Sequence, residues 1–174
     1  MPAARETKPD PSEHLPYYGK YIQLVPEGDI VSTLETQARD AKAFLAGIGA
    51  AVSTYRYAPG KWSVKEMLGH VIDSERVFSA RALIFARGDA ARLPGFEQDD
   101  YVRTASSDSF PLPELAAELE AVRRSTVFLF RHLPEEAWLS RGVANDAEVS
   151  VRALAYIIAG HELHHWEVLR TRYL

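Results

Sequence analysis

The chain has 174 residues, 47% of them hydrophobic and 25% charged, which are ordinary values for one globular domain. Its 20 basic and 24 acidic side chains give a net charge of −4, which argues against a general binder of nucleic acid or of anionic membranes. The sequence contains no cysteine, so disulfides, thiolate metal sites and a catalytic cysteine are excluded. Metal ligands must therefore be histidine, aspartate or glutamate, and any thiol in a reaction must come from a cosubstrate.

The N-terminal part of the sequence differs in composition from the rest. Its first ten residues lack the apolar core of a secretory signal, and no apolar run approaches the ~18 residues of a membrane-spanning helix. We therefore expect a cytoplasmic protein with no membrane partner. Five of the ten prolines lie within residues 1–29, a density that excludes a regular helix. We expect residues 1–27 to form a proline-rich, partly disordered tail ahead of a domain over residues 28–174.

Apolar residues at helical spacing predict the first two helices of that domain. The first covers about residues 29–55, where apolar residues alternate at steps of three and four. The second begins at a capping box, in which Ser63 and Glu66 each satisfy a free backbone N–H, and runs to about Ala86.

Two further helices follow. The third covers about residues 113–132 and is stopped by Pro134, and the fourth runs from Ser150, a suitable N-cap, to the C-terminus. No strand pattern competes, so we expect an all-α four-helix bundle. The connections over residues 87–112 and 134–149 are long, and such loops in a small domain are usually functional or disordered.

Two histidines on the fourth helix have the spacing of metal ligands. His161 and His165 lie ~40° apart around the helix axis and ~6 Å apart along it, so both rings can face one divalent ion, whereas His164 points elsewhere. Both continue the apolar stripe of Leu154 and Ile157, and buried histidines need partners because an unpaired buried polar group costs a few kcal/mol. The pair alone leaves a structural role and a metal site equally open.

His70 is the best candidate for a third ligand, because it lies in an inward-facing row of the second helix. It is ~10 Å from the start of that helix, and the midpoint of the other two histidines is ~12 Å from the end of the fourth. These depths match only if the two helices are antiparallel. Residues 87–112 are long enough to cross the bundle at ~3.3 Å per residue, so the site predicts up-down-down-up topology with a long crossover between helices two and three.

Residues 161–165 also match the zinc-protease pattern H-E-x-x-H, in which Glu162 would be the general base. Such proteases take a third ligand downstream, but only nine residues follow His165 and Glu167 is the sole ligand type among them. We therefore do not expect a protease. Glu162 is kept as a candidate base acting through water, with an exposed helix position as the alternative.

Other polar and aromatic residues are candidates around the metal. Asp73 could orient an imidazole or a metal-bound water, and Arg81 could hold the carboxylate of a cosubstrate. Tyr101 could line the same pocket. The alternatives are that Asp73 and Arg81 form ordinary salt bridges and that Tyr101 anchors the crossover loop. A solvated helix face is expected for the charge run of Glu118, Glu120, Arg123 and Arg124.

Three histidine ligands leave coordination positions open, as is typical of a catalytic rather than a structural metal. Imidazole and water ligands suit zinc, nickel or iron(II), and the residues do not choose among them. Such a metal could lower the pKa of a bound water or hold a substrate thiol as thiolate.

Two separated motifs resemble the DinB-like family, including its YfiT-like branch. The first runs from Trp62 to Glu75 and contains His70, and the second runs from Ala159 to His165. The resemblance implies a four-helix bundle of up-down-down-up topology whose divalent metal is held by His70, His161 and His165. It also implies activities that the family includes, namely transferases using bacillithiol, mycothiol or glutathione, a thiol-dependent isomerase and metal-dependent hydrolases.

The functional hypotheses fall into three classes. The first is a metal-dependent enzyme that transfers a low-molecular-weight thiol to an electrophilic small molecule. The second is a hydrolase in which metal-bound hydroxide attacks an amide or ester. The third is a non-catalytic protein of stress response or interaction. A homodimer is a further expectation, while DNA binding is disfavoured because the net charge is negative and no basic recognition helix is present.

Overall fold

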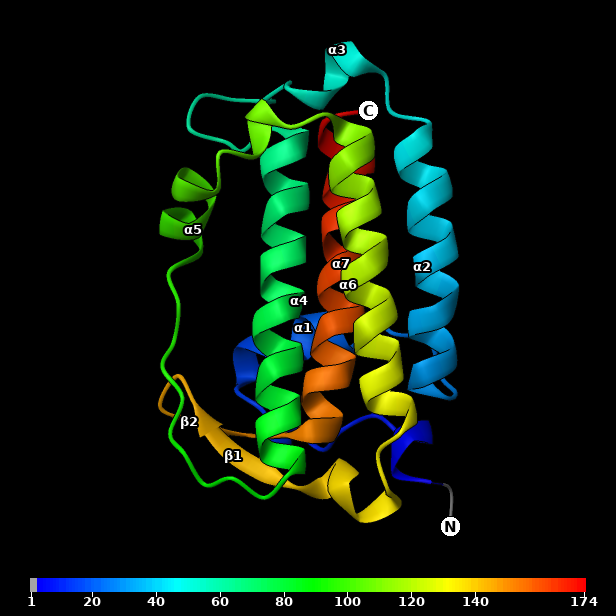
Figure 1. Cartoon of the computed structure of the whole chain (residues 1–174), viewed down its shortest axis with the longest axis vertical. Helices are drawn as coiled ribbons and strands as arrows, with labels where there is room; N and C mark the ends of the chain where they lie inside the picture. The colour runs from blue at the N-terminus through cyan, green and yellow to red at the C-terminus, as the bar shows by residue number, and fades with distance from the viewer. Residues whose placement is uncertain (1–2) are drawn as a thin grey trace.

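Four long helices form the body of the molecule, and the computed structural model describes residues 3–174 (Figure 1). Their bounds are α2 Ile30–Ala46, α4 Val64–Ala86, α6 Leu112–Arg131 and α7 Val151–Arg172. Along the bundle, α2 and α7 run in one direction and α4 and α6 in the other (Figure 1). The predicted all-α four-helix bundle of up-down-down-up topology is therefore confirmed.

The crossover between α4 and α6 runs the length of the bundle along its outside (Figure 1). It contains a short helix that the sequence did not predict, α5 over Gln98–Ala105, followed by the 3-10 turn η4 over Ser107–Ser109. Near its start, the Leu93 N–H donates to the Val143 carbonyl at 2.9 Å. The connection is therefore an ordered layer against α4 and not a free loop.

Two of the predicted helix starts are confirmed in detail. Ser63 Oγ accepts from the Glu66 N–H at 3.0 Å, and Glu66 Oε2 accepts from the Ser63 N–H at 2.8 Å, which completes the capping box of α4. Ser150 Oγ accepts from the Ala153 N–H at 2.9 Å and caps α7. Local hydrogen-bonding chemistry fixes where these two helices begin.

The first predicted helix was too long. α2 ends at Ala46, and the chain turns at Gly47 before the short helix α3 over Ala50–Ser53. Glycine is a poor helix former, so two glycines within three residues favour a break here. Ile48 is buried although it lies beyond the end of α2, so the apolar pattern in the sequence continues past the helix itself.

A hairpin precedes α7, and it corrects the expectation that no strand is present. β1 over Arg141–Ala144 pairs antiparallel with β2 over Ala147–Ser150. Asn145 and Asp146 both have positive φ angles, 54° and 58°, as a two-residue type I′ turn requires. A strand of four residues is too short for alternating apolar and polar residues to be recognised in the sequence. The same connection contains the 3-10 segment η5, Glu135–Leu139, directly after Pro134.

Residues 3–27, termed the N-terminal segment below, pack on the bundle instead of forming the irregular tail expected from their prolines. They form three 3-10 turns and a short helix, and proline stands at the start of two of the turns, where its missing N–H costs nothing. The division into a tail and a domain at residue 28 stays a prediction. The bounds are η1 Ala4–Glu6, η2 Pro11–Glu13, η3 Pro16–Tyr18 and α1 Gly19–Ile22.

Buried charged and polar side chains separate two apolar clusters inside the bundle. The cluster at the β-hairpin end includes Leu34, Phe78 and Phe130, and the other includes Leu68 and Leu169. The layer between them holds Gln37, Glu75, Arg123 and Glu162, all buried. No helix in the described residues is long and apolar enough to cross a membrane.

We predict that Ser63→Ala lowers the free energy of unfolding by about 1 kcal/mol, because α4 loses its N-cap acceptor. Urea denaturation followed by circular dichroism measures the change. Ser79→Ala is the matched control, since Ser79 lies within α4 and caps nothing, and we expect a change within about 0.5 kcal/mol. Equal stability of both variants would contradict the role assigned to the cap.

Candidate metal centre

α4 and α7 bring three histidines together from antiparallel helices. His70 lies two turns into α4, while His161 and His165 lie one turn apart on α7. His161 Nε2 is 3.0 Å from the Nε2 atoms of both His70 and His165. The donor atoms of all three side chains lie within 4.8 Å of one another. The structure thus brings together the three ligands that the sequence predicted.

Burial keeps these three imidazoles neutral near pH 7. The side chains are 4–8% exposed. Burial lowers the pKa of His70 to about 4, against a smaller opposing effect of the Asp99 charge. Burial also holds the pKa values of His161 and His165 well below the usual range, and repulsion from neighbouring histidines adds to the effect. A neutral imidazole keeps the lone pair that a metal requires.

The donor set fits a divalent metal ion. Nitrogen ligands around a tetrahedral zinc at about 2.0–2.1 Å lie about 3.3 Å apart, close to the 3.0 Å separations here. Hydrogen bonds among three neutral rings leave one or more of the converging nitrogens poorly satisfied, because each carries either one proton or one lone pair. His165 Nδ1 is buried without a hydrogen-bond partner among residues 3–174. One cation shared by the three Nε2 atoms suits this arrangement.

Aromatic rings surround the three histidines. Trp62, just ahead of α4, lies against His70 with 4.8 Å between ring centroids. The ring of Tyr21 in α1 stands edge-on to His161 at 5.4 Å, and Phe78 of α4 does so at 6.2 Å. Such walls exclude water and strengthen electrostatic interactions at the centre.

The structure does not bring Glu162 and Asp73 into contact with this centre. Glu162 is buried, so the exposed position considered for it is wrong, and its oxygens accept from Arg123 at 2.6 Å and from the Trp166 indole at 2.8 Å. Asp73 pairs with Arg76 of its own helix at 3.5 Å, and burial raises its pKa. Their proposed roles as base and as orienting group remain untested predictions.

Arg81 and Tyr101 lie on the same side of α4, next to the aromatic wall. Arg81 is 6% exposed, donates to the Pro94 carbonyl at 2.7 Å, and forms no ion pair with a carboxylate within residues 3–174. Burial lowers the pKa of Arg81, and its guanidinium lies over the Phe78 and Phe96 rings. Tyr101 is half exposed and packs on Phe96 at 5.1 Å between ring centroids.

One deeply buried charge, that of Arg123, was misassigned from the sequence. Arg123, expected on a solvated face, is 1% exposed, and its Nε and Nη2 each donate to Glu75 at 2.8 Å. It also contacts Glu162 and, at 3.4 Å, Gln37 Oε1, while Gln37 Nε2 donates to the Ala159 carbonyl. Burial alone would lower the pKa of Arg123, but the two carboxylates outweigh burial and raise it. The only signal in the sequence for the burial of Arg123 was its position on the apolar stripe of its helix.

These features define a class: an up-down-down-up four-helix bundle with a buried three-histidine centre. The family model described as the DinB superfamily matches residues 33–169. The chain therefore belongs to the DinB superfamily.

Two relatives illustrate the family. "Putative metal-dependent hydrolase OB0413" of Oceanobacillus iheyensis is 22% identical over an alignment of 149 residues that covers 81% of this chain and 86% of that protein. The solved structure of YfiT from Bacillus subtilis, described as a probable metal-dependent hydrolase with an unusual four-helix bundle topology, is similar at a TM-score of 0.66. The match has 17% identity and covers 95% of this chain and 93% of that one.

Replacing Arg123 by Met is predicted to destabilise the protein by about 3–5 kcal/mol, because two buried carboxylates lose their counter-charge. Chemical denaturation measures this loss. The matched control is Arg124→Met at the exposed neighbouring position, where we expect a change within about 0.5 kcal/mol. Coinciding denaturation midpoints for the two variants would refute the assigned role of Arg123.

Proposed function

We propose that the protein is a metal-dependent enzyme whose single divalent ion, zinc, nickel or iron(II), is held by His70, His161 and His165. The convergence of three buried, neutral imidazoles supports this proposal most directly. When bound, the ion would lower the pKa of a substrate thiol or of water. The protein's own contribution is a preorganised, water-poor setting in which two helices fix the ligand geometry.

We predict that His70→Ala and His161→Ala each abolish stoichiometric metal binding, because two imidazoles hold an ion far more weakly than three. Elemental analysis of the purified, dialysed protein measures the metal content. His132→Ala is the control, since His132 is exposed at the end of α6. Metal retained at the wild-type ratio by both site variants would overturn the site.

For the reaction itself we propose transfer of a low-molecular-weight thiol, such as bacillithiol, mycothiol or glutathione, to an electrophilic small molecule. In this reaction the sulfur forms a bond to the electrophilic carbon, the leaving group departs with its electron pair, and the thiol proton passes to solvent. One observation favours it over hydrolysis: the oxygens of Glu162, the carboxylate next to His161, are engaged by Arg123 and Trp166 and so are poorly placed to activate a water. The absence of cysteine is compatible with both reactions, and the thiol would come from the cosubstrate.

The environment of Arg81 favours a cosubstrate that carries a carboxylate. A buried guanidinium without a counter-ion is costly, and a ligand carboxylate would remove that cost through charge-assisted hydrogen bonds. The Phe78 ring neighbours both residues, at 5.8 Å from the Arg81 guanidinium and 6.2 Å from the His161 ring, so a carboxylate on Arg81 would be held beside the aromatic wall of the metal centre. Tyr101 would line the open side of this position.

We predict that Arg81→Met raises KM for a carboxylate-bearing thiol about tenfold and leaves KM for its ester nearly unchanged, since one charge-assisted contact is lost. Initial rates with a model electrophile measure this. Arg103→Met, at an exposed arginine paired with Asp100, is the control. An equal effect on the acid and on the ester would show that Arg81 does not bind the carboxylate.

Hydrolysis of an amide or ester is the second candidate, because both relatives are named for metal-dependent hydrolysis. Turnover in the absence of any thiol separates it from transfer, and absence of turnover over a panel of both substrate classes favours the non-catalytic role in stress response or interaction. The homodimer and the cytoplasmic location stay predictions.

A further inference from the structure

The N-terminal segment reaches the metal centre, although it lies outside the residues that match the family model. Its helix α1 places Tyr21 edge-on to His161, and the same ring lies 5.2 Å from the ring of His164. Tyr21 is 5% exposed, and its hydroxyl is 3.1 Å from that of Tyr17. One wall of the centre is therefore supplied by this segment and not by the bundle.

The contact between α1 and α7 depends on a glycine next to a metal ligand. A Cβ atom at Gly160 would lie 2.0 Å from the Tyr21 carbonyl oxygen, so a larger residue here would push the backbone of α1 away. Gly160 immediately precedes His161. The absence of a side chain thus lets α1 lie directly against the helix turn that carries two of the three histidines.

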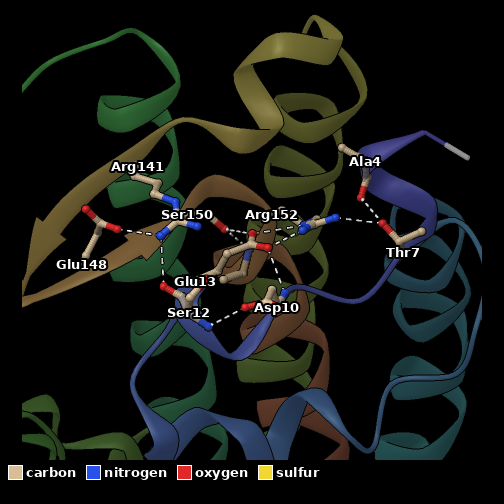
Figure 2. A network of polar contacts seen from close by, with 10 residues as sticks. Ala4, Thr7, Asp10, Ser12, Glu13, Arg141, Glu148, Ser150 and Arg152 are labelled. Carbon is tan, nitrogen blue, oxygen red and sulfur yellow. Dashed lines mark hydrogen bonds and ion pairs between the residues drawn. The ribbon is translucent and has the colours of Figure 1, made fainter. Parts of the chain in front are cut away.

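The segment is anchored to the bundle far from the histidines. Glu13 is buried, and it accepts from Ser150 Oγ at 2.7 Å and from Arg152 Nε at 3.1 Å (Figure 2). Arg152 also donates to Thr7 Oγ1 at 2.8 Å. His161 lies nine positions after Arg152 on α7, which corresponds to about 14 Å along the helix axis. The anchor can therefore be altered without touching any residue of the centre.

The segment also brings a positive charge to the centre. The ammonium of Lys20 lies over the rings of Tyr17 and Tyr21, at 4.2 and 4.8 Å from their centroids. Burial is the main cause that lowers the pKa values of His161 and His165, and the charge of Lys20 lowers them further. A cation at this wall favours anionic molecules near the metal over cationic ones.

We propose that the N-terminal segment controls access to the metal centre and that Tyr21 is its specificity-determining residue. Closed on His161, the segment admits only molecules that fit beside the Tyr21 ring, and its release exposes the histidines. This inference rests on the proposed metal site for its function, but the shielding of the histidines is a property of the chain alone.

The first experiment uses the metal-free chain and diethyl pyrocarbonate, which acylates exposed neutral imidazoles. The rate at His161 is measured by peptide mass spectrometry relative to the exposed His132 of the same molecule. Tyr21→Ala should raise this relative rate about tenfold. His161 reacts only in molecules whose N-terminal segment has opened, and the variant increases their fraction. Tyr21→Phe keeps the ring and should stay within about twofold of wild type.

The second experiment tests the remote anchor with the zinc-loaded chain. Glu13→Gln should speed zinc transfer to the chromogenic chelator pyridylazoresorcinol about fivefold or more, because the anchor weakens and the segment opens more often. The matched control is Glu120→Gln, at an exposed carboxylate paired with Lys42, which should leave the rate unchanged. Thermal melting of each variant identifies any global unfolding, and only rates measured well below the melting range are compared.

The proposal is overturned if the Tyr21→Ala variant keeps a folded bundle and its His161 is modified at the wild-type rate. Equal zinc release from the Glu13 and Glu120 variants overturns it as well. Failure of the proposed function has a different signature: the wild-type chain then binds no metal, while the modification experiment in the metal-free chain still decides whether the segment shields His161.

Discussion

The buried ion pairs of Arg123 set the register on which the rest of the bundle depends. One guanidinium from α6 meets carboxylates from α4 and α7, and an amide from α2 completes the layer. A slip of any helix by one turn moves its side chain by about 5.4 Å and leaves a buried charge unpaired, at a cost of several kcal/mol. Hydrophobic packing alone tolerates such slips far better, because it has no direction.

This register also assembles the metal centre. Glu75 lies five residues after His70 on α4, and Glu162 directly follows His161 on α7. The alignment that brings both carboxylates to Arg123 therefore brings the three imidazoles together on the neighbouring faces of the same helices. The arrangement explains why His161 Nε2 lies 3.0 Å from the Nε2 atoms of both His70 and His165.

Particular residues show what the sequence could and could not foretell. The three histidines were predictable because two share one helix face and the third matches them in depth, which also fixed the topology. Arg123 was not, since its partners are 48 and 39 residues away in the chain and charged side chains on a helix are usually exposed. The burial of Glu162 was missed for the same reason, because its partner is Arg123. From Val151 to Glu162 α7 is buried on nearly all sides, so the apolar stripe that contains the histidines did not reveal that the side carrying Glu162 is buried as well.

The N-terminal segment was misjudged for a related reason. Its prolines exclude a regular helix, but they suit the first position of 3-10 turns, and the contacts that hold these turns come from Ser150, Arg152 and Gly160 at the other end of the chain. The bundle thus supplies the three histidines proposed as metal ligands and the Phe78 ring beside them. The N-terminal segment adds Tyr21 to this wall, and the crossover packs Phe96 and Tyr101 behind Phe78. Ligand geometry depends on a rigid register, while walls tolerate variation. The proposed metal site therefore depends on the bundle, whereas the proposed control of access depends on the N-terminal segment, so the two can change independently of each other.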